Sequence, residues 1–185
     1  AMVGFSPAAS AASDPQRMLF SHEWIEGKLK IMDMGSWQIK EPEMEIGQFP
    51  VEINLTPDGS QAWVSKYLDA NMSVIDLSTN TLVGSGVDAG EKEGDIGNIR
   101  GAAFSPDGNR AYVRRDWWST PDEIMVLDTV DLAPLRAPLQ LPTTDTIGSP
   151  LVSTDGLSLY IFVSDPTDQI LVYDTRTMQL SGPPI

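Results

Sequence analysis

The sequence predicts an all-β protein built from four copies of one four-stranded antiparallel unit. Two similar patterns recur along the chain at a spacing of about fifty residues: a turn motif, and an apolar run that ends in aspartate. In addition, no segment has a convincing helical period. These three observations indicate a repeat architecture made of short strands.

The turn motif occurs in "LTPDGSQAWV" from Leu55, "FSPDGNRAYV" from Phe104 and "VSTDGLSLYI" from Val152, with a broken copy at "FSP" from Phe5. Proline presets φ, aspartate can accept a hydrogen bond from the backbone that follows, and glycine tolerates positive φ. We therefore expect a corner between the first and second strands of each unit. A catalytic loop would not be expected to recur in every repeat with drifting residues.

The second pattern ends at one aspartate in each unit. These residues are expected to form turns by bonding the backbone after them, and they are Asp33, Asp76, Asp128 and Asp174. Four strands per repeat of this length is typical of a β-propeller blade, whose sheet packs on its neighbours. The predicted fold is thus a β-propeller of four four-stranded antiparallel blades, approximately 2–47, 48–97, 98–147 and 148–185.

The segment "PDGSQAWVSKYLDANMSVIDLSTNTLVGS", from Pro57 to Ser85, resembles the YVTN-type β-propeller repeat. The tetrapeptide that names that family falls on Trp63–Lys66, Tyr112–Arg115, Tyr160–Val163 and, less closely, Leu19–His22. The resemblance implies an extracytoplasmic location, meaning periplasmic, secreted or cell-surface. It is compatible with surface-layer modules, lactonase-like enzymes and the large subunits of some dehydrogenases.

Members of that family commonly close with more blades than four. We therefore expect part of a longer propeller chain, or a homodimer in which the four blades of each copy together form one eight-blade ring. An open array of four blades is expected to leave one face of its first and last sheets uncovered. Depending on which face each strand presents, this would expose residues such as Ile31, Leu171 or Tyr173.

Composition excludes several classes of partner and site. A formal net charge of −14 and a pI near 4.2 argue against a nucleic-acid partner or an anionic membrane surface. No run of eighteen apolar residues occurs, so membrane insertion is not expected. The absence of cysteine excludes disulfides, thiol nucleophiles and cysteine-ligated metals.

In a propeller, the connections between strands two and three and between consecutive blades emerge on one face, here called the loop face. Its candidate binding residues are aromatic or cationic: Trp24, Tyr67, Arg114, Arg115, Trp117 and Trp118. Exposed tryptophans can stack on sugars or anchor a protein partner. The alternative, which we prefer for at least one of Trp117 and Trp118, is that they fold over the groove between blades as core.

His22 is the only histidine, so a metal triad of histidines is impossible. We interpret it as an ordinary loop histidine, and as an acid–base group only in the alternative. Candidate calcium ligands are the carboxylates of Asp69, Asp165 and Asp168, together with Glu91, Glu93 and Asp95. None has EF-hand spacing, so solvated charge is the preferred interpretation and no cofactor is expected.

The leading hypothesis is a non-catalytic module that binds a protein or carbohydrate ligand through the loop face. The alternative is a lactonase-like hydrolase, or a dehydrogenase subunit whose cofactor lies elsewhere. An enzyme would require a convergent set of histidine, glutamate and arginine around the central channel. One histidine and dispersed arginines favour binding.

Overall fold

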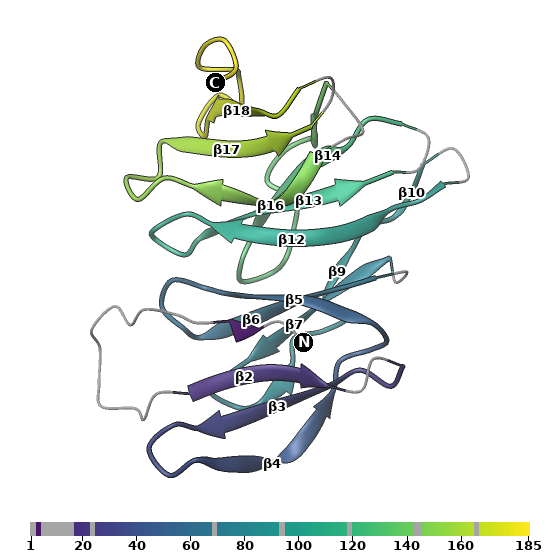
Figure 1. Cartoon of the computed structure of the whole chain (residues 1–185), viewed down its shortest axis with the longest axis vertical. Helices are drawn as coiled ribbons and strands as arrows, with labels where there is room; N and C mark the ends of the chain where they lie inside the picture. Colours follow the sequence, from purple (N-terminus) through teal and green to yellow (C-terminus); the bar gives the residue numbers. More distant parts are fainter. Residues whose placement is uncertain are drawn as a thin grey trace. The chain divides into compact units, whose positions relative to one another are not determined.

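The computed structural model describes residues 3–4, 17–22, 25–67, 70–92, 95–117, 120–142, 146–164 and 167–185. In these residues the regular secondary structure is entirely β, as Figure 1 shows, so the prediction of an all-β protein is confirmed. None of the described segments forms a helix that could span a bilayer. The chain divides into two compact units, unit 1 (Ala1–Asp88) and unit 2 (Ala89–Ile185).

Unit 1 contains two antiparallel sheets among its described residues. Sheet 1 has its strands in chain order: β1 (Val3–Gly4), β2 (Arg17–His22), β3 (Lys28–Asp33) and β4 (Gln38–Glu45). Sheet 2 has the order β5 (Pro50–Leu55), β6 (Gln61–Lys66), β7 (Asn71–Asp76) and β8 (Thr81–Leu82), and β9 (Val87–Asp88) also pairs with β7.

Unit 2 begins with a short hairpin of β10 (Glu91–Lys92) and β11 (Asp95–Ile96), which contains the calcium candidates Glu91 and Asp95. Sheet 3 follows with the order β12 (Asn98–Phe104), β13 (Arg110–Asp116), β14 (Glu123–Asp128) and β15 (Leu139–Gln140). Sheet 4 consists of β16 (Thr146–Val152), β17 (Ser158–Val163) and β18 (Gln169–Asp174). All pairings between the described strands of both units are antiparallel.

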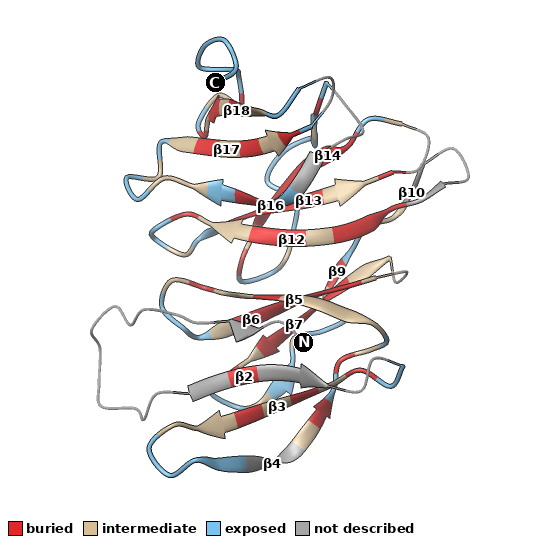
Figure 2. Ribbon diagram, viewed as in Figure 1, coloured by how far each residue is buried: buried red, intermediate tan, exposed pale blue. Residues whose placement is uncertain are grey.

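Each unit has a core between one face of its first sheet and one face of its second. Strand β17 illustrates the rule, because Leu159, Ile161 and Val163 are buried while the residues between them are only partly buried (Figure 2). This period of two places alternate side chains on opposite faces. The unit 2 core joins these residues to sheet 3 side chains such as Tyr112 and Ile124.

The residues that we expected on an uncovered face are in fact on the covered one. Ile31 belongs to the core between sheets 1 and 2, and Leu171 and Tyr173 belong to the core between sheets 3 and 4. The strand register decides this: it places Tyr173 opposite Leu159 and Leu171 opposite Ile161 on the inner face. That expectation about the exposed residues was therefore wrong.

The three complete turn motifs, Pro-Asp-Gly in sheets 2 and 3 and Thr-Asp-Gly in sheet 4, form the predicted corners. Gly59, Gly108 and Gly156 have φ between +70° and +74°, and each N–H closes a turn on the carbonyl three residues earlier, at 2.8–2.9 Å. In the sheet 3 corner, the Asp107 carboxylate accepts hydrogen bonds from the Ser105 hydroxyl and the Asn109 backbone N–H. The turn motif of these three sheets thus has a structural role: it joins the first strand to the second.

The strand-end aspartates behave as predicted in all four sheets. The Oδ1 atom of each accepts hydrogen bonds from the backbone N–H groups two and three residues later. Four residues after each aspartate, a non-glycine residue adopts a positive φ of 55–60°; these residues are Trp37, Asn80, Leu132 and Met178. One turn geometry therefore repeats four times, although the residue at its strained position varies.

The predicted fourth strand is an interrupted strand in three of the sheets. In sheet 2, Leu82 pairs with Ile75 and Val87 pairs with Met72. The outer strand therefore advances five residues while β7 advances only three, and the extra residues leave the ladder. Sheet 3 repeats this spacing with Pro134 and Leu139, and sheet 4 repeats it with Leu180 and Ile185, which bonds Ile170 at 3.0 and 3.1 Å. The interruption in sheet 2 contains Gly86, where a Cβ would lie 2.1 Å from the Met72 carbonyl oxygen.

We expect Gly108→Val to destabilise the protein far more than Asn109→Ala. Valine at a φ of +74° costs roughly 1–2 kcal/mol. Loss of the exposed Asn109 side chain is expected to change stability by about 0.5 kcal/mol or less, because alanine keeps the backbone bond to Asp107. Urea denaturation of both variants measures the difference, and equal midpoints would contradict the turn assignment.

A second expectation is that stability decreases in acid through the turn carboxylates. The Ser105 hydroxyl and the Asn109 N–H lower the pKa of Asp107 below its ordinary value of 3.8, and the Ser153 hydroxyl does the same for Asp155. Because the folded-state pKa values lie below the unfolded ones, the stabilisation is complete above about pH 4 and is lost as the pH falls further.

Urea midpoints measured between pH 6 and pH 2.5 check this expectation. Asp107→Asn should show a weaker dependence on pH over the acid range than the wild type, because its side chain cannot be protonated there. If both proteins lost stability in parallel, Asp107 would not contribute to the acid sensitivity.

Candidate functional site

The polar end of sheet 3 is the candidate site, and it lies where the connection from strand two to strand three emerges. The register aligns Asn98 with Asp116, Arg115 with Glu123, and Glu123 with Gln140, so four strands meet at one end. We call this group the loop-end cluster, and its members are Asn98, Arg100, Arg114, Arg115, Asp116, Trp117, Asp122, Glu123 and Gln140.

Arg115 and Glu123 form the centre of the cluster. The Arg115 guanidinium donates through Nη2 to the Glu123 carboxylate and through Nη1 to the Ala89 carbonyl at 2.5 Å. The Gln140 amide donates to the other oxygen of Glu123, whose side chain is only 3% exposed. Charge-assisted bonds of this kind compensate for the desolvation of a buried carboxylate.

Arg114 and Arg100 extend the cluster toward sheet 4. Arg100 Nε donates to Asp116 Oδ2 at 2.7 Å, and Arg114 Nη2 lies 4.0 Å from the same oxygen. Arg114 Nη1 also donates to the Gly148 carbonyl at 2.7 Å, where β16 departs from regular pairing with β17. This side chain thus joins the second strand of sheet 3 to the first strand of sheet 4.

The charges of the cluster balance within it. It contains three arginines and three carboxylates, namely Arg100, Arg114, Arg115, Asp116, Asp122 and Glu123. Asp122 is fully buried, and its Oδ1 accepts a hydrogen bond from the Trp117 backbone N–H at 3.4 Å. The arrangement therefore anchors both ends of the loop between β13 and β14.

Trp117 is part of the interior of unit 2. Its side chain is buried, its ring lies 4.7 Å from the Arg115 guanidinium carbon, and a Cβ on Gly97 would approach the ring to 3.0 Å. Stacking of an arginine on the indole face adds a cation–π contact to this packing. Of the two alternatives for Trp117, the structure follows the one in which it acts as core.

The structure gives both predicted binding arginines, Arg114 and Arg115, partners inside unit 2. Tyr67 is half-buried in unit 1, where its backbone N–H donates to the Phe49 carbonyl at 2.8 Å. The binding candidates Trp24 and Trp118 lie outside the described residues, and so do the calcium candidates Asp69, Glu93 and Asp165.

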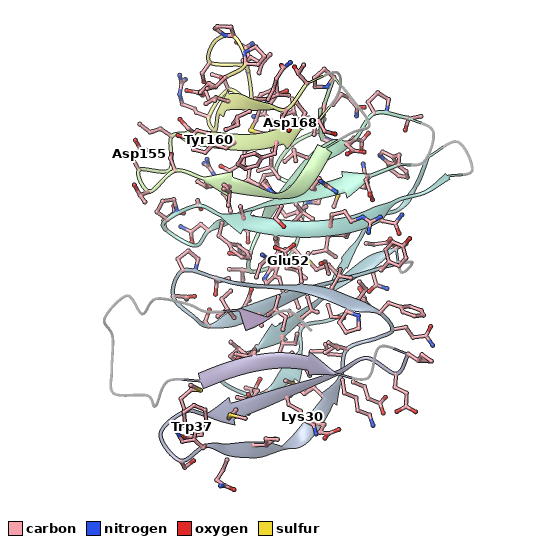
Figure 3. All side chains as sticks on the ribbon, in the orientation of Figure 1. Lys30, Trp37, Glu52, Asp155, Tyr160 and Asp168 are labelled. Atoms are coloured by element: carbon pink, nitrogen blue, oxygen red, sulfur yellow. The ribbon has the colours of Figure 1, made fainter. Side chains whose placement is uncertain are left out.

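The remaining candidates do not converge in the part of the chain that the structure describes. His22 ends β2 opposite Lys28, Glu91 pairs with Ile96, and Asp95 pairs with Lys92; the structure does not describe the His22, Glu91 and Asp95 side chains. Asp168 is exposed just before β18, at the opposite end of sheet 4 from the Asp155 corner (Figure 3). Among the described residues, no three histidine, cysteine or acidic side chains are grouped to hold a metal.

Sequence reasoning did not single out six of the nine cluster residues, which are Asn98, Arg100, Asp116, Asp122, Glu123 and Gln140. Glu123 opens the apolar run "EIMVLD", and Arg100 interrupts "NIRGAAF". A charged residue at the end of an apolar strand was the available signal. Aligning the predicted hairpin would have placed Glu123 across from Arg115, since opposite charges are favoured at directly paired positions.

Comparison with known proteins places the fold but not the family. No protein-family model and no curated protein matches the sequence. Among solved structures, a chain of Kuenenia stuttgartiensis hydrazine synthase is similar, with a TM-score of 0.73 and 17% sequence identity. The match covers 98% of this chain and 53% of that one, so the chain spans about half the length of the structure that it resembles.

We expect Glu123→Ala to lower the free energy of unfolding by roughly 3–5 kcal/mol, because it leaves the Arg115 guanidinium without its buried counter-ion. The double variant Arg115→Met/Glu123→Leu should be less damaging, since no charge is then left behind. Urea denaturation and a double-mutant cycle measure both effects.

The matched control for this experiment is Glu26→Ala. Glu26 pairs with Lys28 at 3.2 Å, but its side chain is 68% exposed, so the expected loss is about 1 kcal/mol or less. Similar losses for Glu123→Ala and Glu26→Ala would show that the Arg115–Glu123 pair does not stabilise the fold.

Proposed function

We propose that the protein is a non-catalytic binding module with β-propeller architecture, in which the four sheets act as blades and the loop face contacts a protein or carbohydrate ligand. The loop-end cluster is the observation that carries the binding role. Its arginines and carboxylates bind each other and the backbone, which suits a rigid platform for loops better than acid–base chemistry.

The platform would position the loop between β13 and β14. Trp117 is the first residue of this loop and Asp122 is the last. Both are buried, and the Trp117 N–H donates to the Asp122 carboxylate, so both ends of the loop are fixed. Ligand contacts would then come from the residues between them, including Trp118. Loops held at both ends by a rigid scaffold are common binding elements, because less conformational entropy is lost when a ligand binds.

The propeller architecture is supported by repetition along the chain. The aspartate turn recurs in all four sheets, and the corner motif and the interrupted outer strand recur with the same local geometry in sheets 2, 3 and 4. The similar solved structure supports the same arrangement of strands over nearly the whole chain. In this proposal the natural assembly is extracytoplasmic and contains more sheets than the four of one chain.

The two adjacent tryptophans provide the test. We expect Trp118→Ala to abolish binding on a glycan array while leaving the melting temperature almost unchanged. Trp117→Ala should instead cost roughly 3–5 kcal/mol of stability, because it empties a buried site. The matched control is Trp37→Ala, which removes a tryptophan that is 65% exposed in the turn between β3 and β4.

Two results would contradict the proposal. Glycan binding that persists in Trp118→Ala, and is lost in Trp37→Ala, would move the binding site away from the loop face. Hydrolysis of lactone substrates by the purified wild type would favour the lactonase-like alternative.

A further inference from the structure

The outer face of sheet 4, on the side away from sheet 3, is apolar. Alternation along β17 and β18 places on it the side chains between those of the core, and the register pairs Tyr160 with Val172, Phe162 with Ile170, and Leu151 with Tyr160. We call these five residues the outer apolar face. Leu151 is 52% exposed and the other four are partly exposed, so no part of unit 2 fully covers them.

The inner face of β17 and β18 is apolar as well. Leu159, Ile161, Leu171 and Tyr173 are buried against sheet 3. Strands β17 and β18 therefore carry apolar residues on both faces, which is typical of strands covered on both sides. A strand with one face in water normally alternates between apolar and polar residues instead.

Strand β3 of sheet 1 shows that alternation. Its core residues alternate with residues of the outer face, which is the side away from sheet 2. Lys28, Lys30 and Glu43 lie there, and Lys30 Nζ is 2.5 Å from a Glu43 carboxylate oxygen. Among the side chains that the structure describes on this face, Met32 and Ile39, which pair across β3 and β4, are apolar. The described outer face of sheet 1 thus carries three charged side chains, whereas the five residues of the outer apolar face of sheet 4 carry none.

We propose that the outer apolar face of sheet 4 is a self-association surface, on which the same face of a second copy packs across a two-fold axis. This goes beyond the proposed ligand binding and uses a different surface. A two-fold contact requires a patch that complements itself, and the five residues are uncharged. Packing of two apolar sheet faces, as within each unit, meets that requirement.

Sheet 4 could instead pack on sheet 1 of the second copy, and the charges on sheet 1 argue against that contact. Placing the outer apolar face on sheet 1 would bury Lys28, Lys30 and Glu43 against apolar side chains, and buried charge is costly unless its partners remain in good geometry. A contact between the outer apolar faces of two copies buries no lysine. The charged residue nearest to it is Asp174, at the rim, and turn N–H groups already bind that carboxylate. The net charge of −14 opposes any association of two copies, and a contact with no carboxylates at its centre adds least to that repulsion.

Light scattering coupled to size exclusion, at chain concentrations from 1 to 100 µM, tests the surface. We expect the wild type to approach twice its chain mass of 20.1 kDa. Leu151→Lys should weaken dimerisation at least tenfold, and Phe162→Lys should do the same. Circular dichroism and melting curves confirm that both variants are folded, and Leu151 keeps the test valid if the Phe162 variant does not fold.

The matched control is Met32→Lys on the outer face of sheet 1, which should leave the dimer intact. A wild type that stays at 20.1 kDa at every concentration would overturn the proposal. So would a dimer that survives Leu151→Lys but dissociates in Met32→Lys. A dimer that both substitutions dissociate would indicate contact of sheet 4 on sheet 1, and would equally overturn it.

Cysteine cross-linking distinguishes the two contacts directly, because the chain has no native cysteine. Single cysteines at Tyr160, Ile170 and Val172 sample the centre of the face, where equivalent residues of two copies meet near the axis. We expect at least one of the three to form a disulfide-linked dimer on mild oxidation, and Met32→Cys to form none. Cross-linking by Met32→Cys alone would overturn the proposal.

Discussion

The burial of one apolar sheet face against another is the interaction on which the rest of the structure depends. A sheet of three or four short strands cannot exclude water by itself, and each unit solves this by packing two such sheets together. The period of two along each strand then determines which side chains enter the core. A shift of one residue in pairing would exchange Leu159 and Ile161 for Tyr160 and Phe162, so the register must be fixed at the strand ends.

The turns fix that register. In sheets 3 and 4, the residue after the strand-end aspartate returns to the preceding corner: Thr129 Oγ1 donates to the Gly108 carbonyl, and Thr175 Oγ1 donates to the Gly156 carbonyl, both at 2.6 Å. Corner and strand end are thereby joined, and the two strands between them, β13 and β14 in sheet 3 and β17 and β18 in sheet 4, cannot slip independently. At the opposite end of sheet 3, the Arg115–Glu123 ion pair holds β13 and β14 in register.

Local chemistry was predictable from the sequence, and contacts between distant residues were not. The Pro-Asp-Gly corners and the turns after Asp33, Asp76, Asp128 and Asp174 depend on residues within a few positions of each other. The β10–β11 hairpin was missed because its strands are two residues long and three of their four residues are charged. The Trp117 side chain is buried because its ring packs beside Gly97 and against the Arg115 guanidinium. These contacts come from tertiary packing, so the sequence near Trp117 could not predict them. The residues of the loop-end cluster could have been paired only after the hairpin register was known.

The interrupted outer strands bear on aggregation. A long, regular edge strand presents a row of unpaired N–H and carbonyl groups on which another chain can add a strand. In sheets 2, 3 and 4 the outermost segment pairs at two points and departs from the ladder between them, at Gly84–Gly86, at 136–138 and at 182–184. Pro138, Pro183 and Pro184 also lack the N–H that an incoming strand would need. An architecture with many sheet edges can thus remain resistant to amyloid-like growth.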